Sequence, residues 1–138
     1  MVFSSTSGGS AWVPSPFSGV SYSFLKLGGS DPAVVTLRKI DAGSTMPPHR
    51  HPNIERNYLI TGRAQLLDGS IIEAGAYMEI PAGVRHGATA LEECVFHDSY
   101  DGSLVWVEDS GTMTAVNSNG DFVPFGSMPP LSSANLPI

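Results

Sequence analysis

Glycine and proline interrupt this chain so often that only short elements of secondary structure fit between them. The 138 residues include 15 glycines and 11 prolines, and no window of useful length combines a helical hydrophobic period with helix caps. Short β-branched or alternating runs lie between the turn signals. Because many short strands separated by turns are typical of β-sandwiches and barrels, the sequence predicts an all-β fold and excludes a helical bundle.

The expected strands lie in the central part of the chain. Asp68-Gly69 is a two-residue hairpin signal, and Asp101-Gly102 marks a second turn. The runs predicted to be strands are residues 33–40, 58–61, 63–67, 70–74, 76–80, 93–100 and 104–108.

Both ends of the chain differ in composition from the centre. Residues 1–16 are rich in serine and glycine and are expected to form an arm that docks through Trp12 and Phe17. Residues 17–110 are expected to form the barrel. Residues 111–138 contain four prolines, and proline disfavours central strands. We therefore expect an irregular tail that wraps the domain or a neighbouring subunit.

Charge and cysteine content restrict the classes of partner. Lys and Arg number 7 against 13 Asp and Glu, for a net charge of −6, and an acidic surface repels nucleic acid and anionic membranes. Cys94 is the one cysteine, so we expect a small buried apolar residue and no internal disulfide. No apolar run is long enough to span a bilayer, and no signal peptide is evident. A cytoplasmic protein is expected.

Two of the four histidines stand one residue apart, in the segment Pro-Pro-His-Arg-His-Pro at 47–52. Residues i and i+2 of a strand share a face, so His49 and His51 are expected side by side. An ordinary polar role remains open for this pair alone. Glu55 and His86 each lie beside turn residues that could aim them at the same cavity. Imidazoles with one carboxylate suit Fe, Mn, Ni, Co or Zn.

The spacing around the histidine pair resembles the first motif of the cupin family, G(X)5HXH(X)3–4E(X)6G. Its fixed positions match Gly43, His49, His51, Glu55 and Gly62.

A second stretch resembles the second cupin motif, G(X)5PXG(X)2H(X)3N. Gly75, Pro81, Gly83 and His86 match it, and Ala90 stands where the motif has asparagine. That difference concerns local loop order and leaves the expected metal ligands in place.

The resemblance implies a double-stranded β-helix, the cupin jelly-roll barrel, with one divalent metal held by His49, His51, Glu55 and His86. Some cupin dioxygenases bind iron through three histidines alone. Glu55 is in that case an acceptor that orients a ligand imidazole. Fe(II) is the favoured metal, with Mn, Ni, Co and Zn as alternatives.

The resemblance extends loosely to cupins that include the dihydroxyacetophenone and acetylacetone dioxygenases. It implies a mononuclear non-haem Fe(II) dioxygenase for a small diketone, enol or phenolic substrate. An isomerase, lyase or polyketide cyclase could use the same site without O2. The group also resembles zinc-binding domains of anti-sigma factors, so a non-enzymatic zinc or ligand-binding role is a third class, and a storage cupin a fourth. A homodimer is expected.

Further residues are candidates for the surroundings of the metal. Met78, Ile80, Phe96 and Trp106 could form the apolar wall of a substrate pocket, or belong to the plain core. His97 lies in the expected strand 93–100, where alternation does not say which face points inward. It is either a polar residue of the outer face or an acid/base group near the metal.

The arginines are expected to be surface charges, with Arg50 pointing away from its histidine neighbours. Arg38, Arg56 and Arg63 are candidates for one inward cation that holds a substrate carboxylate. The remaining arginine is Arg85.

Overall fold

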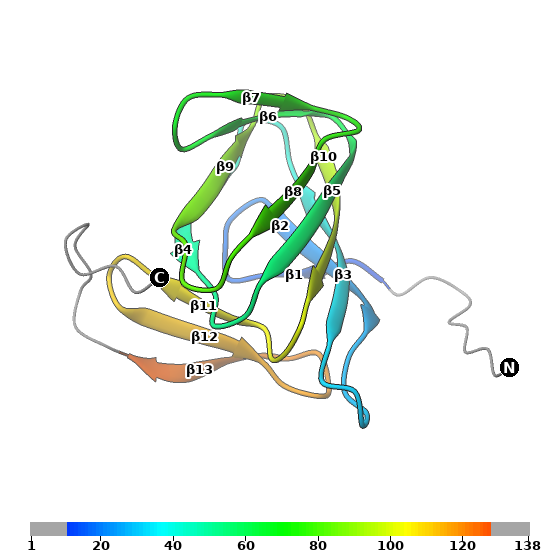
Figure 1. The fold of residues 1–138 in the computed structure, drawn as a ribbon, viewed down its shortest axis with the longest axis vertical. Coiled ribbons are helices and arrows are strands. Elements are labelled where there is room, and N and C mark those ends of the chain that lie inside the picture. The colour runs from blue at the N-terminus through cyan, green and yellow to red at the C-terminus, as the bar shows by residue number, and fades with distance from the viewer. Residues whose placement is uncertain (1–10, 128–138) are drawn as a thin grey trace, which may run out of the picture.

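The structure, a computed structural model that describes residues 11–127, is built from antiparallel strands in two sheets (Figure 1). The strands are β1 (Val13–Pro14), β2 (Val20–Lys26), β3 (Val34–Ile40), β4 (Thr45–Arg50), β5 (Glu55–Thr61), β6 (Arg63–Leu66), β7 (Ile71–Glu73), β8 (Tyr77–Ile80), β9 (His86–Ala90), β10 (Cys94–Tyr100), β11 (Val105–Glu108), β12 (Thr112–Val116) and β13 (Phe122–Ser127). One sheet has the order β1-β2-β3-β10-β5-β8 and the other β13-β12-β11-β4-β9-β6-β7. No helix occurs in residues 11–127, so none there could cross a membrane. The all-β jelly roll is confirmed.

Alternation along the two central strands of the six-stranded sheet defines its inner face. In β3 and β10, every second side chain is buried. Antiparallel pairing sets Phe96 opposite Arg38 and Asp98 opposite Thr36. Because alternate side chains of a strand point to opposite faces, this register brings polar as well as apolar residues into the barrel.

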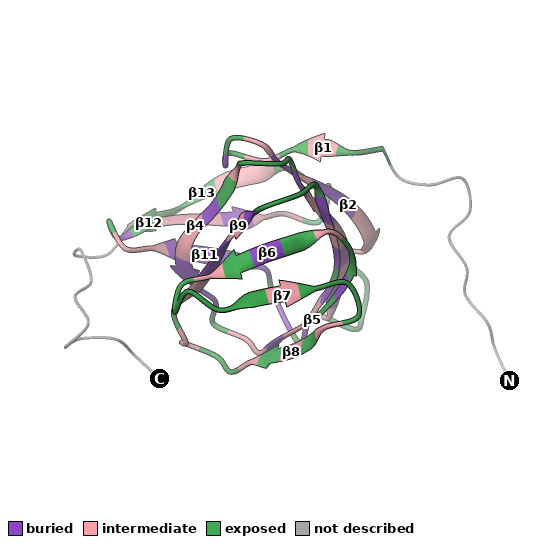
Figure 2. Cartoon of the chain, turned by 90° about the horizontal axis from the view of Figure 1, so that it is seen from above, coloured by how far each residue is buried: buried purple, intermediate pink, exposed green. Residues whose placement is uncertain are grey.

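One hydrophobic cluster with residues from both sheets fills the barrel. Trp106 is completely buried in it and packs edge-on against Phe17 and Tyr22, at centroid distances of 5.7 and 5.5 Å. Phe17 thus docks the chain that precedes β2. Figure 2 shows exposed residues along β7 and β8 and buried ones on β4 and β11. The core is therefore covered by the middle of the seven-stranded sheet, while the exposed strands β7 and β8 lie at sheet edges.

The prediction of an irregular tail from residue 111 is wrong for residues 112–127. β12 and β13 extend the seven-stranded sheet beyond β11. β13 is an edge strand, and an edge has room for a residue without an N–H donor, which is why Pro124 is tolerated there. The other prolines of this stretch lie outside the described residues, as do residues 1–10.

The turn between β5 and β6 gives a test of the fold. Gly62 has a φ of +95°, and a Cβ there would collide with the carbonyl of Glu93 and lie 3.0 Å from the Cα of Cys94. We expect Gly62→Ala to lower the free energy of unfolding by about 2–5 kcal/mol, because left-handed backbone strain and overpacking add. Urea denaturation measures this change.

Gly69→Ala is the matched control. Gly69 has a φ of +89° with nothing within 4 Å of an added Cβ. Its replacement should therefore cost only the strain of a left-handed backbone, about 1–2 kcal/mol of unfolding free energy. Equal losses in the two variants would contradict the packing at Gly62.

Candidate metal centre

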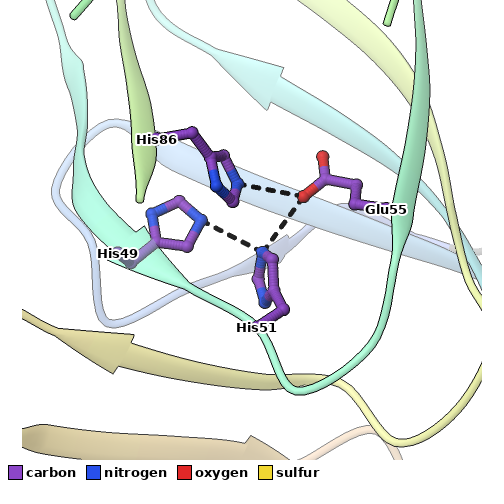
Figure 3. Close-up of side chains that lie close together, drawn as sticks. All are labelled: His49, His51, Glu55 and His86. Atoms are coloured by element: carbon purple, nitrogen blue, oxygen red, sulfur yellow. Dashed lines mark hydrogen bonds and ion pairs between the residues drawn. The ribbon is translucent and has the colours of Figure 1, made fainter. Parts of the chain in front are cut away.

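The four residues singled out by the motifs lie together inside the barrel (Figure 3). β4 pairs with β9 so that His49 stands opposite His86. His51 follows the end of β4, and Glu55 begins β5 in the other sheet. One candidate ligand atom from each residue lies within 4.8 Å of all the others. Two short motifs thus meet at one point between the sheets.

Backbone carbonyls fix the orientation of each imidazole. The Nδ1 atoms of His49, His51 and His86 donate to the carbonyl oxygens of Pro47, Val105 and Val84, at 2.7, 2.8 and 2.9 Å. A neutral imidazole that carries its proton on Nδ1 leaves the Nε2 lone pair free. All three rings are therefore held in the tautomer that binds a metal through Nε2.

The free nitrogens converge on one another and on a carboxylate. His49 Nε2 lies 3.1 Å from His51 Nε2, and Glu55 Oε1 lies 3.0 Å from His51 Nε2 and 3.2 Å from His86 Nε2. Lone pairs this close repel unless a cation lies among them. Ligand atoms about 2.0–2.1 Å from a metal ion are separated by about 3.0–3.4 Å. These three separations match those between ligands of one divalent ion, and Glu55 Oε1 lies close enough to the histidines to be a direct ligand.

Burial and charge keep the site in its ligating state. Burial lowers the pKa of His49 well below its ordinary value, and the charges of His86 and His51 add to this. Burial would raise the pKa of Glu55, but hydrogen bonds from His51 and His86 outweigh it, and the pKa lies well below the usual range. His49 is thereby kept as a neutral imidazole and Glu55 as a carboxylate, which are the forms that bind a metal ion.

A second layer of charge lies behind Glu55. Arg38 Nε is 2.8 Å from Asp98 Oδ2, and its Nη2 donates to Asp98 Oδ1 at 3.1 Å and lies 3.8 Å from Glu55 Oε2. Asn57 Nδ2 also donates to Glu55 Oε2, at 3.1 Å. The guanidinium stacks over Phe96 at 4.3 Å. These contacts turn Oε2 away and present Oε1 to the histidines.

A cavity of about 280 Å³ reaches this cluster at His86. Met78, Ile80 and Phe96 line it, as the alternation in β8 and β10 allows. Asn57 lines it as well, and its Oδ1 is buried without a hydrogen-bond partner in the described part of the chain. The cavity therefore combines an apolar patch with charged and polar residues, and the Oδ1 of Asn57 is an acceptor without a partner beside the candidate metal ligands.

The other predicted site residues lie elsewhere. His97 is exposed on the outer face of β10, so the alternative of an inward acid/base group is wrong; its buried neighbours Phe96 and Asp98 occupy the inner face. Trp106 does not line the cavity. It packs in the core with its ring 6.3 Å from that of His51, where it supports a candidate ligand. Cys94 is buried, as expected, and burial raises the pKa of its thiol.

The arginines divide between core and surface. Arg38, one of the three candidates for an inward cation, is inward and 5% exposed, but it is paired with Asp98 instead of being free for a substrate carboxylate. Arg56 and Arg85 form exposed ion pairs with Asp101 and Asp109. Arg38 is thus the inward arginine among the three candidates, but the role of Asp98 as its partner was missed, because alternation in 93–100 does not say which face points inward.

Comparison with known proteins identifies the family. The family model described as the ChrR cupin-like domain matches residues 4–102. The chain belongs to the ChrR cupin-like family. A search of curated proteins gives no significant match.

Solved cupin-fold structures resemble this family member in fold. The polyketide cyclase RemF from Streptomyces resistomycificus has a TM-score of 0.62 at 19% identity, over 72% of this chain and 79% of RemF. An acetylacetone dioxygenase from Acinetobacter johnsonii has a TM-score of 0.60 at 18% identity, over 93% and 91%. Rhodobacter sphaeroides SigE in complex with the anti-sigma ChrR gives 0.56 at 23%, over 65% and 48%. At these identities the likeness concerns the fold.

Removing one imidazole tests the ligand set of this cupin. We expect His51→Ala and His86→Ala each to lower metal content by at least about tenfold, the scale that even changes outside the ligand shell reach. Elemental analysis of the purified proteins gives the stoichiometry. His97→Ala is the control, because His97 is exposed on the outer face, and should keep full metal content. Full occupancy in both ligand variants would refute the site.

The buried histidine makes the metal-free protein sensitive to acid. Because the pKa of His49 is lowered in the folded state, the unfolded chain binds a proton below about pH 6.5 that the folded chain does not. Folding stability then falls as pH drops, by up to about 1.4 kcal/mol per unit. Asp98 acts in the opposite sense, since burial raises its pKa to about 7.

The quantity to measure is therefore the slope of unfolding free energy against pH, compared between the wild type and variants. Chelator-treated wild type and His49→Gln are unfolded in urea between about pH 6.5 and 5, above the range in which Glu55 titrates. The wild type should show the more positive slope of stability against pH, and His97→Gln should keep the wild-type slope. Identical slopes for wild type and His49→Gln would contradict a buried neutral imidazole.

Proposed function

We propose that this cupin is a metal-dependent enzyme, a mononuclear non-haem Fe(II) dioxygenase for a small chelating substrate such as a diketone, an enol or a phenol. The observation that carries the proposal is the convergence of three Nε2 atoms and Glu55 Oε1 beside a cavity of about 280 Å³. Four protein ligands leave coordination positions for other molecules. The acetylacetone dioxygenase among the similar structures supports this class.

His49, His51, Glu55 and His86 would hold the metal. Bound Fe(II) would supply Lewis-acid polarisation of a chelating oxygen pair and the electrons for chemistry with O2. The protein would contribute the shape of the site, since Met78 and Ile80 of β8 and Phe96 of β10 give the cavity an apolar patch for the body of a substrate.

Asn57 is the group that orients the substrate. Its Nδ2 is committed to Glu55 at 3.1 Å, while its Oδ1 remains as an acceptor on the cavity wall. A buried acceptor without a partner is costly, so a ligand that donates a hydrogen bond to it is favoured. An enol or phenol hydroxyl has this donor together with a flat apolar body that suits Met78 and Phe96.

Two alternatives keep the same metal site. A cyclase, isomerase or lyase would use the metal without O2, and the similarity to the polyketide cyclase RemF favours this reading. A non-enzymatic zinc or ligand-binding role is favoured by the ChrR family model. The expected homodimer and cytoplasmic location stay predictions.

Oxygen consumption separates these functions. The protein loaded with Fe(II) is supplied with pentane-2,4-dione and with a panel of small phenols in an oxygen electrode. We expect substrate-dependent uptake that His86→Ala abolishes and His97→Ala preserves. Asn57→Leu should raise KM by about tenfold for the hydroxyl-bearing substrates, the scale of one hydrogen bond to a buried group.

Other results of this experiment would support one of the two alternative functions. Product formed equally with and without O2 would replace the dioxygenase by a lyase, isomerase or cyclase. One tightly held zinc per chain with no turnover under either condition would leave a binding protein.

A further inference from the structure

A second cationic group lies buried on the opposite side of β4 from His49. Arg50 is only 2% exposed, so the prediction of a surface charge is wrong. Its Nε, Nη1 and Nη2 atoms are buried, and none has a hydrogen-bond partner in the part of the chain that the structure describes. Asp109, the acid that acts on Arg50 electrostatically, is held by Arg85 in an exposed pair at 2.7 Å.

Arg50 lines a hollow of about 800 Å³ on the outer side of the seven-stranded sheet. Val105 and Val107 line it, and both belong to a small apolar cluster separate from the main core. Met113 and Phe125 lie on its wall as well. The hollow therefore has a largely apolar wall, with one guanidinium group at its surface.

The acidic and amide groups of this hollow have partners of their own. Asp101 binds Arg56 at 2.8 Å, and Asn53 donates to the carbonyl of Ser103 at 3.2 Å. Asp101 is therefore paired with another arginine, and the neutral amide of Asn53 is turned to a backbone carbonyl instead of to Arg50. A buried guanidinium without a partner is unfavourable, and a bound anion relieves that cost.

We propose that this hollow is a binding site for a small organic carboxylate with an apolar tail. A guanidinium offers a planar fork of N–H donors that matches the two oxygens of a carboxylate. Val105, Val107 and Met113 provide the apolar surface against which a short hydrocarbon chain packs. A neutral ligand would leave the charge unpaired, and a fully polar anion would leave the apolar wall unused.

The hollow shares no lining residue with the cavity of the proposed enzyme, but it reaches the candidate metal centre at His51. His51 lines the hollow, and its Nδ1 donates to the carbonyl of Val105, a residue of the hollow wall. The proposal does not depend on the metal. It is best tested on the full chain after metal removal, so that carboxylate cannot bind at a metal ion.

Hexanoate is a suitable probe, with hexanamide as its uncharged counterpart. Calorimetric titration should give one hexanoate per chain, with hexanamide at least about tenfold weaker, the scale of a charge-assisted hydrogen-bond pair. Arg50→Met should lose hexanoate binding by at least the same factor. Arg63→Met, which removes an exposed arginine paired with Glu92, should bind as the wild type.

Thermal unfolding provides a second readout. Hexanoate should raise the Tm of the wild type and leave that of Arg50→Met unchanged. If Arg50→Met fails to fold, Arg50→Lys can replace it, because lysine keeps the positive charge but lacks the planar pair of N–H donors. This variant should bind hexanoate more weakly than the wild type.

Several results would overturn the proposal. They are no saturable binding at millimolar hexanoate, equal affinity for hexanamide, or undiminished binding in the Arg50 variants. Binding that is lost in His86→Ala but kept in Arg50→Met would place the carboxylate among the histidines instead. None of these results bears on whether the histidines hold a metal.

Discussion

The hydrogen bonds from three imidazole Nδ1 atoms to backbone carbonyls are the constraint on which the candidate metal centre depends. Two are local, since His49 and His86 each donate to the carbonyl two residues earlier. The third joins His51 to Val105 on another strand. Together they decide the tautomer and direction of every ring, and the β4–β9 register brings His49 and His86 face to face. Without these hydrogen bonds, nothing would hold the three rings with their Nε2 atoms directed at one another.

The charges behind the site show why a cation suits it. Glu55 and Asp98 are both buried, and Arg38 is the cation placed between them. When both carboxylates are ionised, the single guanidinium leaves an excess of negative charge beside the imidazoles. Burial raises the pKa of Asp98, and the nearby Glu55 adds to that rise against the opposing effect of Arg38. A divalent ion at the histidines compensates the excess directly.

The sequence was sufficient to predict the features of the fold and site that depend on the spacing of nearby residues. The strands that alternate clearly and the four motif residues all lie where they were expected, because short-range periodicity and turn residues determine them. The rest depends on packing between distant segments. Alternation in 93–100 could not tell whether His97 or Asp98 faces inward, and Arg50 gave no sign of its burial. β9, made of small residues around Gly87, has little strand signal of its own and forms by pairing with β4 and β6.

The bond between His51 and Val105 spans 54 positions of the sequence. Both motifs precede Val105, so neither contains the acceptor that orients the ring of His51. The ligand set therefore depends on β11, which pairs with β4, as well as on the two motif segments. A fragment that ended before β11 would contain all four candidate ligands but would lack the carbonyl that holds His51 in its ligating orientation.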